Sequence, residues 1–331
     1  MSASKIIDQA NNEANLIIQN QAVFNLAVII PAYNRWDETA ECLEKMFQDA
    51  YLTKRIFLID DGSLDGTTER CRERFPWVEI LQGNGNLWWS GAINLGVKTA
   101  LLGGADLVLW LNNDNLIEPG TITRLVEVYR RSPLRSVICA ENRSTETGEL
   151  EWQGEPPFWH PKVSAWQADQ GRDPILSLKH PPGGRGVLIP AICFREVGVV
   201  DEAQFPHYWA DHDFHYRAME RGYRYLLVRG ATVWNRPNPP RFEGVAPFTL
   251  LWGWLYLASR RSPMNLLTLH RLWRRHLLPP EYRYVLAGYV RRTLYWLLTG
   301  LIVRYGWLYS CLKRIKLLVK NLNDSKILPF C

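Results

Sequence analysis

Three amides and one carboxylate, Asn112, Asn113, Asp114 and Asn115, directly follow the largely apolar segment 105–111. Such an apolar run predicts a buried strand, whose end delivers polar side chains to one edge of a sheet. In open α/β sheets, ligands bind at the carboxyl ends of the strands. A single carboxylate among oxygen-bearing side chains suits a hard divalent cation that water and phosphate oxygens otherwise hold. An ordinary Asn/Asp turn explains this segment equally well when it is taken alone.

A second apolar run, residues 26–30, ends at Pro31 and is followed by Ala32, Tyr33 and Asn34. Proline stops a strand, so this segment predicts a strand, a short loop and then a helix. An aromatic side chain at such a strand end can stack on a nucleobase. A plain strand–loop–helix junction is the alternative interpretation.

A third apolar run, residues 55–59, ends at the paired carboxylates Asp60 and Asp61. These groups can accept hydrogen bonds from a ribose or from a base N–H, whereas Asp65 is expected to cap the following helix. The glycine-rich segment 82–96 comes next, and its glycines let backbone N–H groups approach a phosphate or a sugar closely. A glycine-rich loop is weak evidence by itself.

The order and spacing of these segments resemble the family 2 glycosyltransferases of GT-A fold, in particular the rhamnosyltransferase-like branch. The resemblance covers about residues 26–238, with a weaker similarity at 262–265. It implies an α/β, Rossmann-like fold with a mostly parallel central sheet and helices on both faces. It also implies transfer of a hexose or deoxyhexose from a nucleotide-sugar donor to a hydroxyl acceptor, with inversion at the anomeric carbon.

The resemblance also assigns roles to single residues. Asp114 is expected to bind a divalent cation, Mg²⁺ or Mn²⁺, that neutralises the leaving diphosphate. Asn235 stands where relatives often carry a histidine ligand, and an amide oxygen is a weaker ligand, so a metal-independent variant is also open. The expected donor-binding residues are Pro31, Ala32, Tyr33, Asn34, Asp60, Asp61, Gly91, Asn94, Asn112 and Asn113.

The segment 208–214 resembles the second acidic motif of the family, with Ala210 in place of its first acid. Matched position by position, Asp211 is the expected general base, which removes the proton of the acceptor hydroxyl. Asp213 is expected to orient the helix start or the acceptor, and His212 to point away from Asp211. The alternative is that both aspartates only favour the helix N-terminus electrostatically.

The acceptor side is less readable in the sequence. Arg185, between two glycines, is expected on the acceptor side. It can meet a phosphate on the acceptor or the donor, and a solvated loop arginine is the alternative. Sugar rings stack on aromatic faces, but burial in the core explains any one tryptophan equally well. Trp209 is the expected acceptor contact among several aromatic residues near the motifs, which are Trp88, Trp89, Trp159, Trp166, Tyr208 and Trp209.

Composition agrees with a globular enzyme. The 331 residues are 47% hydrophobic, which supports a well-buried core. The six cysteines form no C-x-x-C pair, which argues against a zinc site and a disulfide framework and favours reduced thiols in the cytoplasm. No basic stretch precedes an apolar core at the N-terminus, so no signal peptide is expected. Residues 1–25 are expected to be a loose lead-in with a short helix around 6–18.

Charge is distributed unevenly along the chain. Residues 250–331 contain 14 Lys and Arg against Glu281 and Asp324, a net charge of +12, so residues 1–249 carry −6 of the chain's overall +6. Cationic and aromatic side chains mixed on helices favour an anionic membrane surface, and we expect a peripheral protein on the inner face of the cell membrane. The apolar run 293–303 is shorter than the roughly 20 residues that span a bilayer. A solvated basic face is an open alternative, and no nucleic-acid recognition motif is present.

These side chains require alternating strands and helices to position them. Strands are expected at 26–31, 54–60, 77–82, 105–112, 136–140, 187–193 and within 223–233, and helices at 36–49, 65–74, 90–102, 118–131 and 211–221. Residues 141–185 are expected to form an irregular or hairpin-containing insertion. The domains are then a lead-in at 1–25, a catalytic domain at 26–240 (nucleotide-sugar half 26–115, acceptor half 116–240) and a helical tail at 241–331. A non-catalytic nucleotide-sugar or glycan-binding protein on the same fold is the alternative function.

Overall fold

The computed structural model describes residues 23–51, 54–151, 173–180, 182–236 and 250–304. The chain divides into two compact units, residues 1–239 and 240–331, and each is described by itself. The helix expected around residues 6–18 lies outside the described residues.

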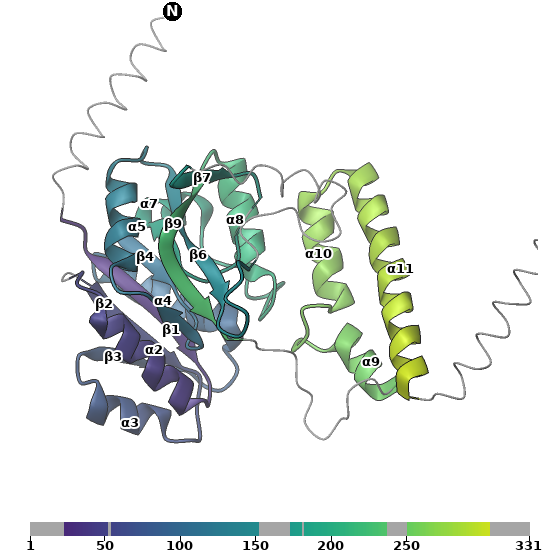
Figure 1. Cartoon of the computed structure of the whole chain (residues 1–331), viewed down its shortest axis with the longest axis horizontal. Helices are drawn as coiled ribbons and strands as arrows, with labels where there is room; N and C mark the ends of the chain where they lie inside the picture. Colours follow the sequence, from purple (N-terminus) through teal and green to yellow (C-terminus); the bar gives the residue numbers. More distant parts are fainter. Residues whose placement is uncertain (1–22, 52–53, 152–172, 181, 237–249, 305–331) are drawn as a thin grey trace, which may run out of the picture. The chain divides into compact units, whose positions relative to one another are not determined.

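The first half of the larger unit is a parallel sheet in the order β3-β2-β1-β4 (Figure 1). The register of β1 and β2 pairs Ala32 with Asp60, so these two strands end level with each other. The apolar runs become strands because their side chains are buried on both faces, which is typical of a parallel sheet. The elements are β1 (Leu26–Ala32), α2 (Trp36–Gln48), β2 (Lys54–Asp60), α3 (Thr67–Arg74), β3 (Val78–Gln82), α4 (Trp88–Leu102) and β4 (Leu107–Trp110).

The second half continues the same sheet in the order β8-β6-β9-β5, with β7 paired to β9. Here β8 is antiparallel to both β4 and β6, β6 is parallel to β9, and a bulge interrupts their register at Ala140/Glu141. The expected α/β fold class, with helices against a central sheet, is confirmed. The elements are β5 (Asn115–Ile117), α5 (Thr121–Arg130), β6 (Ser136–Ser144), β7 (Ile175–Leu178), β8 (Val187–Pro190), α7 (Ala191–Val197), α8 (Ala210–Glu220) and β9 (Arg224–Asn235).

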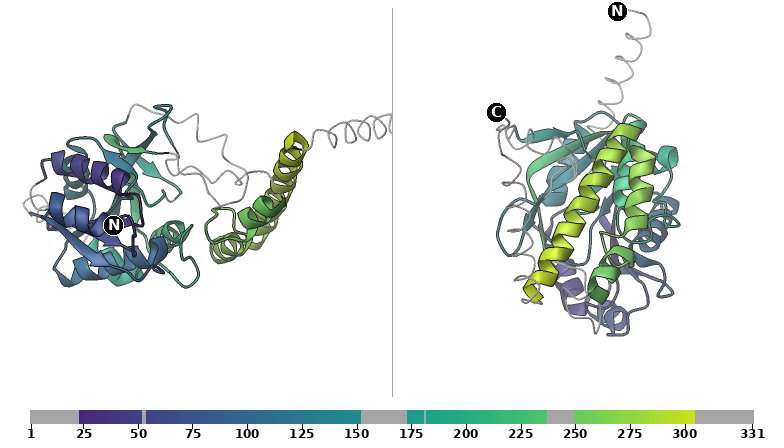
Figure 2. Two further views of the ribbon diagram at one scale, coloured as in Figure 1. Left: turned by 90° about the horizontal axis from the view of Figure 1, so that it is seen from below. Right: turned by 90° about the vertical axis from the view of Figure 1, so that its right-hand side faces the viewer.

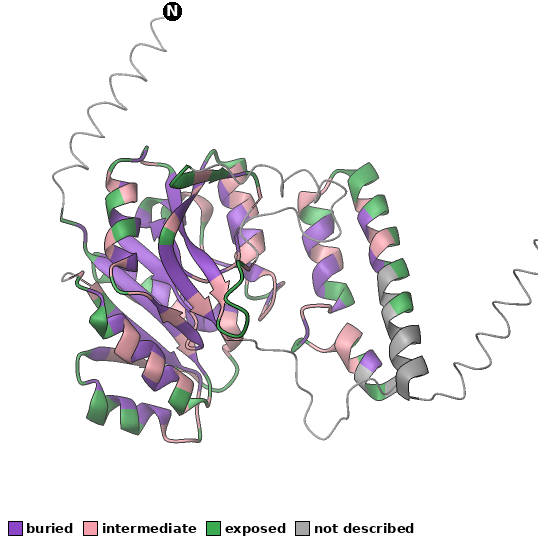
Figure 3. Ribbon diagram, viewed as in Figure 1, coloured by how far each residue is buried: buried purple, intermediate pink, exposed green. Residues whose placement is uncertain are grey.

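The sheet is the centre of the core, and its central strands are buried almost throughout, whereas β3 and β7 are more exposed (Figure 3). Helix α4 lies very close to β1, because a Cβ on Gly96 would meet Ile29 Cγ2 at 2.5 Å. Glycine is therefore needed here for helix–strand contact. The described cysteines Cys42, Cys71, Cys139 and Cys193 are free and buried.

The expected and observed elements differ at three places. The strand expected over 187–193 ends at Pro190, where helix α7 begins, because proline has no N–H for a continuing ladder but fits well before a helix. The helix expected from 118 begins at Thr121, after Gly120 in a left-handed conformation. Strand β5 was not expected: only three residues long, it carries Asn115, which reads as a turn in sequence.

The described part of the second unit, residues 250–304, contains three helices, α9 (Leu250–Ala258), α10 (Leu266–His276) and α11 (Pro279–Arg304). Helices α10 and α11 lie side by side (Figure 2), with Trp273 and Tyr289 in edge contact at 5.3 Å between ring centroids. Asn265 caps α10 by accepting the N–H of Thr268 at 2.9 Å. Among the described residues, no helix combines the length and the hydropathy that crossing a membrane requires.

Candidate functional site

Asp60 holds the loop that follows β2. Its Oδ1 accepts the N–H of Ser63 at 2.9 Å, and its Oδ2 accepts the hydroxyl of Thr68 at the start of α3. The residue is only 1% exposed. Both carboxylate oxygens therefore order this loop, and the expected contact of Asp60 with the donor stays a prediction.

Asp61 organises the glycine-rich loop in the same way. Its carboxylate accepts three backbone N–H groups, from Gly85 at 2.9 Å, Leu87 at 3.1 Å and Trp88 at 2.9 Å. A Cβ on Gly83 would lie 2.5 Å from Asp61 Oδ1, so glycine lets the loop close on the carboxylate. Asp61 thereby fixes the start of helix α4.

The segment after β1 is tied to the same loop. Ala32 accepts the N–H of Asp61 through its carbonyl at 2.9 Å, and Asn34 Oδ1 accepts the N–H of Leu64 at 2.8 Å. Asn34 has a φ of 47°, a left-handed conformation that asparagine tolerates. Tyr33, which follows Pro31 and Ala32 at the end of β1, is 52% exposed. Its ring is thus available at the sheet edge for the predicted stacking.

Two of the expected donor-binding residues lie inside helix α4. The Asn94 side chain donates to the carbonyl of Val200 at 3.0 Å and to Glu202 at 2.8 Å, and accepts the N–H of Val200 at 3.1 Å. Gly91 is buried, and a Cβ there would lie 3.2 Å from the Leu87 Cβ. Asn94 thus joins α4 to the segment before α8, and a donor contact would require these bonds to open.

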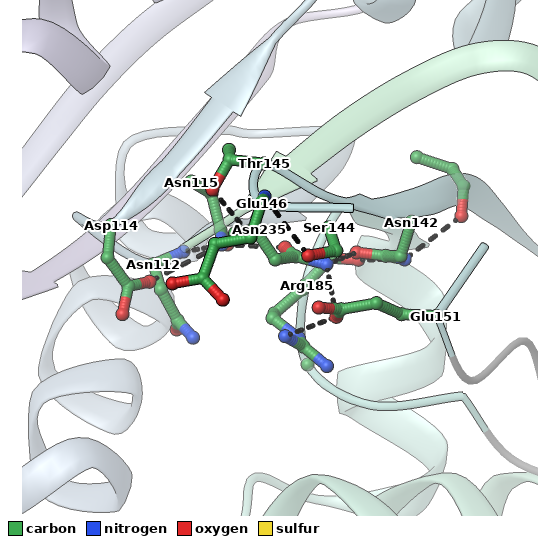
Figure 4. A network of polar contacts seen from close by, with 12 residues as sticks. Asn112, Asp114, Asn115, Asn142, Ser144, Thr145, Glu146, Glu151, Arg185 and Asn235 are labelled. Carbon is green, nitrogen blue, oxygen red and sulfur yellow. Dashed lines mark hydrogen bonds and ion pairs between the residues drawn. The ribbon is translucent and has the colours of Figure 1, made fainter. Parts of the chain in front are cut away.

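The amides after β4 form a polar network with the end of β9 (Figure 4). Asn115 donates to Asn235 Oδ1 at 2.8 Å and lies 3.3 Å from Asp114 Oδ1. Asn235 donates in turn to Asn142 Oδ1 at 3.0 Å and to Glu151 Oε2 at 2.8 Å. The antiparallel register of β5 and β9 places Asn115 directly opposite Asn235, which is why the amides meet.

The other two amides of this segment face α2 and α4. Asn112 Oδ1 accepts the indole N–H of Trp89 at 2.9 Å. Asn113 donates to the hydroxyl of Thr39 at 3.0 Å. Their expected donor contacts stay predictions, because each side chain is only partly exposed and already has a protein partner.

Asp114 is a buried carboxylate with cations beside it. Burial raises its pKa above the usual range, while Arg35 and Arg185 act electrostatically in the opposite direction. Arg35 lies 3.7 Å from Asp114 Oδ2. A nearly buried carboxylate that lies beside positively charged side chains is chemically suited to a hard cation.

The side chains available as ligands around Asp114 show whether a divalent cation fits at this position. Among the described residues, no group of three or more His, Cys, Asp or Glu side chains is arranged to hold a metal ion. Asn235 is fully buried, and its Oδ1 already accepts a hydrogen bond from Asn115. Asp114 thus fits a cation held mainly by diphosphate and water oxygens, whereas ligation by Asn235 stays a prediction that requires this network to rearrange.

Asp211 begins helix α8 and is held by three donors. Its Oδ2 accepts the N–H of Gly184 at 2.7 Å, and its Oδ1 accepts the N–H of His212 at 2.9 Å and lies 3.0 Å from His212 Nδ1. Burial alone would raise its pKa, but the neighbouring His212 imidazole and the hydrogen bonds from His212 outweigh burial and hold the pKa of Asp211 well below the usual range. Asp211 is therefore a carboxylate at neutral pH, with its side chain 20% exposed.

The expectation that His212 points away from Asp211 is wrong. The first turn of α8 lets the imidazole fold back onto the neighbouring carboxylate, and Trp209 lies against its ring at 4.9 Å between centroids. One turn further on, His215 is fully buried and pairs through Nδ1 with Tyr225 Oη at 2.9 Å. Burial lowers the pKa of His215 to about 3, so this histidine is neutral.

Asp213 has no exposed surface and forms an ion pair with Arg217 at 2.9 Å. Arg217 also donates to the carbonyls of Val197 and Val199, so this pair joins α8 to the end of α7. An acceptor contact of Asp213 stays a prediction that needs the pair to open. Its observed contacts are those of a residue that positions helix α8.

Two tryptophans have left-handed backbone conformations at helix starts, Trp88 with φ 55° and Trp209 with φ 72°. Such conformations cost about 1–3 kcal/mol for a bulky residue and concentrate at functional sites. The two segments meet, because Ser90 donates its N–H to the carbonyl of Pro206 at 3.1 Å. The predicted acceptor residue Trp209 therefore lies beside Asp211 on a tightly fixed backbone.

The loop 183–186 connects the two polar centres. Gly184 binds Asp211, and a Cβ there would lie 2.7 Å from Trp89 Cζ2, so only glycine permits this approach. Arg185 pairs with Glu151 at 2.9 Å, and Gly186 donates to the carbonyl of Trp110 at 2.9 Å. One short loop thus places Arg185 between the Asp211 and Asp114 regions.

Sequence reasoning missed Arg35, Asn142, Glu151 and His215. Arg35 directly follows the Pro31–Asn34 segment, so its position was a usable signal. The other three residues enter the site through strand register and helix packing, and no motif in the sequence marks them.

Comparison with known proteins gives a family match. Residues 27–178 match the model of the family described as "Glycosyl transferase family 2". The chain is 30% identical over 135 residues to the uncharacterized glycosyltransferase YibD of Escherichia coli (strain K12), covering 40% of this chain and 38% of that protein. It is 24% identical over 144 residues to a poly-beta-1,6-N-acetyl-D-glucosamine synthase of Staphylococcus epidermidis, covering 40% of this chain and 33% of the relative.

A third relative is the uncharacterized glycosyltransferase RT0329 of Rickettsia typhi, 25% identical over 182 residues, with 54% of each chain covered. The chain thus matches from one third to about half of the length of these relatives.

Two solved structures share the fold of the chain. GalNAc-T7 in complex with UDP, GalNAc and Mn²⁺ aligns with a TM-score of 0.54 at 15% identity, covering 77% of this chain and 55% of the other. Residues 1–349 of S. aureus TarS align with a TM-score of 0.51 at 12% identity, covering 81% of this chain and 71% of the other. At these identities the likeness establishes the fold and nothing further.

Proposed function

From the premise that the chain belongs to glycosyl transferase family 2 and has a GT-A-like fold, we propose that it is an inverting glycosyltransferase. It moves a hexose or deoxyhexose from a nucleoside-diphosphate sugar to a hydroxyl acceptor. The observation that carries this proposal is an ionised, partly exposed carboxylate, Asp211, bound to Gly184, while the next residue, Arg185, acts electrostatically on a second carboxylate, Asp114.

Asp211 acts as the general base in this proposal. An ionised carboxylate has about four lone-pair positions, and among the described residues Gly184 and His212 donate three hydrogen bonds to it. The remaining position, on Oδ2, accepts the acceptor hydroxyl and removes its proton as the oxygen attacks the anomeric carbon. The three fixed donors keep the carboxylate in one orientation, which favours an in-line attack.

Asp114 supports departure of the nucleoside diphosphate. A divalent cation bound there would neutralise negative charge that develops on the leaving group. Support comes from the charged environment of the Asp114 carboxylate and from the GT-A-like neighbour that was solved with UDP and Mn²⁺. Tyr33 is proposed to stack on the nucleobase, because its ring is exposed at the end of β1.

We also propose that the acceptor is a lipid-linked or surface-polysaccharide glycan, made at the inner face of the cell membrane. The relative from Staphylococcus epidermidis is named for synthesis of a polysaccharide. In the second unit, Trp254 is 65% exposed and Tyr295 69% exposed, and arginines 260, 261, 274, 275, 283 and 291 are also exposed. Exposed aromatic and cationic side chains together favour an anionic lipid surface.

The decisive experiment is a turnover assay with a panel of nucleotide sugars, with and without Mn²⁺. If one nucleotide sugar releases its nucleoside diphosphate, and a hydroxyl acceptor increases the rate of release, the protein is a glycosyltransferase. Tight donor binding without release in any combination favours the rival function, a non-catalytic nucleotide-sugar-binding protein.

The membrane proposal has its own test with the full-length protein. Sedimentation with anionic vesicles is expected at low salt, less at high salt and little with neutral vesicles, because each basic residue contributes roughly 1 kcal/mol near an anionic surface. Trp254→Ser should reduce sedimentation at every salt concentration. If the full-length protein does not sediment with anionic vesicles at low salt, the membrane proposal is ruled out.

A further inference from the structure

Arg185 is fixed in place by backbone and side-chain contacts. Its carbonyl accepts a hydrogen bond from Asn142 Nδ2 at 3.2 Å, and the next residue, Gly186, is bound to both β4 and β6. Glu151 Oε2 pairs with one guanidinium nitrogen at 2.9 Å. The position of this cation is therefore determined by the fold, unlike that of a solvated loop arginine.

Glu151 is shared between Arg185 and the amide network. The same oxygen, Oε2, accepts the amide N–H of Asn235 at 2.8 Å (Figure 4). Glu151 is thus itself oriented by a fully buried residue at the end of β9. Through this chain of contacts, the strand end opposite Asn115 sets the direction of the Arg185 side chain.

Arg185 keeps donors for a ligand. A guanidinium has five N–H groups, and among the described residues its only hydrogen-bonding side-chain partner is Glu151. The side chain is 34% exposed, so the remaining N–H groups can reach an incoming molecule. In Figure 4 the guanidinium and the carboxylate of Asp114 point to the same side of the network.

A diphosphate bound near Asp114 carries negative charge that a cationic side chain of the protein could neutralise. Arg185 and Arg35 both act electrostatically on Asp114, so their charge reaches the place where a diphosphate would meet a cation. Asp114 alone, with Asn235 held in the network, supplies few protein ligands to a metal ion. A diphosphate there needs further neutralisation, and a planar guanidinium matches phosphate oxygens in a bidentate manner.

We propose that Arg185, held by Glu151, binds the diphosphate of the nucleotide-sugar donor and neutralises it as it leaves. The assignment rests on the proposed function and moves Arg185 from the acceptor side, where the sequence placed it, to the donor side. Glu151 is a positioning residue in this arrangement, because it acts through Arg185.

The test is calorimetric titration of the full-length protein with UDP, GDP, CDP and TDP, and with the nucleoside that matches the diphosphate bound. Arg185→Gln should weaken diphosphate binding by about tenfold to hundredfold, the equivalent of a lost hydrogen bond between charged groups. Arg185→Lys keeps the charge and can still pair with Glu151, so its affinity for the diphosphate should lie between those of the parent and Arg185→Gln. Binding of the nucleoside should not change, because it carries no phosphate.

Arg131→Gln is the matched control, since Arg131 is an exposed arginine at the end of α5 and should leave all affinities unchanged. Diphosphate binding by Arg185→Gln within about twofold of the parent, less than one hydrogen bond contributes, would overturn the proposal. A raised KM for a phosphorylated acceptor with unchanged diphosphate binding would also overturn it and return Arg185 to the acceptor. A parent protein that binds none of the four diphosphates would contradict the proposed function itself.

Discussion

Two acidic regions of the larger unit look alike in sequence but differ in how their carboxylates are used. At the end of β2, Asp60 and Asp61 accept hydrogen bonds from their own loops through both carboxylate oxygens. Asp211 instead accepts two backbone N–H groups and contacts an imidazole, and its side chain remains 20% exposed, whereas Asp114 lies 3.7 Å from the cation of Arg35. The first region builds the loops, and the second has capacity left for chemistry.

A carboxylate at a strand end is therefore not by itself a ligand group. Each N–H bound to Asp61 uses a lone pair that a ribose or a base would otherwise occupy. At Asp211 three hydrogen bonds likewise fix the orientation of the carboxylate, but its side chain is 20% exposed, whereas Asp61 is buried within the loop that it holds. Substitutions in the two regions should therefore separate activity from stability.

The largest effect is expected at the base. Asp211→Asn should lower turnover by at least about a hundredfold, because general-base catalysis contributes 10²–10⁴-fold, with donor affinity within about threefold of the parent. Steady-state kinetics and donor titration measure the two quantities. If the variant keeps more than about a tenth of parental turnover, the loss is too small for a general base and Asp211 is not the base.

Asp61→Ala should act on stability instead. It removes the acceptor of three backbone N–H groups in a partly buried loop, so the free energy of unfolding should fall by about 3 kcal/mol. Chemical denaturation measures this value. The matched comparison is Asp211→Ala, where a smaller loss of stability is expected because two backbone N–H groups lose their partner instead of three, and because the Asp211 side chain is partly exposed. Equal losses in the two variants would break the distinction between the regions.

A third prediction concerns pH and His215. Its pKa is about 3 in the folded protein against 6.5 ordinarily, so between these values the unfolded chain binds a proton that the folded chain does not. Stability must then fall as the pH is lowered through this window, by about 1.4 kcal/mol per pH unit from this residue. In His215→Gln, unfolding free energies measured between about pH 6.5 and pH 4.5 should lose that part of the slope. An unchanged slope would mean that His215 is protonated in the folded state.

The sequence predicted the first half of the fold well. Strands 26–32 and 54–60 and helix 36–48 agree with expectation within one residue, because long apolar runs and proline or glycine boundaries define them locally. Prediction was poorer for elements whose existence or bounds depend on tertiary contacts. Strand β5 exists because Asn115 pairs with Asn235, and α7 begins where β8 ends at Pro190.

The candidate site shows the same division between residues that a local motif marks and residues that only the folded chain brings together. Asp114 and Asp211 were named as candidates through the motif resemblance, which also predicted the family, and the roles of these two residues stay predictions. Glu151 and Asn142 were not named, since their roles come from the register of β6 and β9 and from a contact with Asn235. The contact between His212 and Asp211 depends on a side-chain rotamer in the first turn of α8, which residue order alone does not specify.

The account rests most directly on the claim that the donor diphosphate binds at Asp114 with a divalent cation. Titration of the preferred nucleoside diphosphate into the parent and into Asp114→Ala, each with and without Mn²⁺, tests this claim. The parent should bind more tightly when Mn²⁺ is added, and the variant should bind equally with and without it, because the carboxylate that links the cation to the protein is gone. Equal stimulation of both proteins by Mn²⁺ would contradict the account.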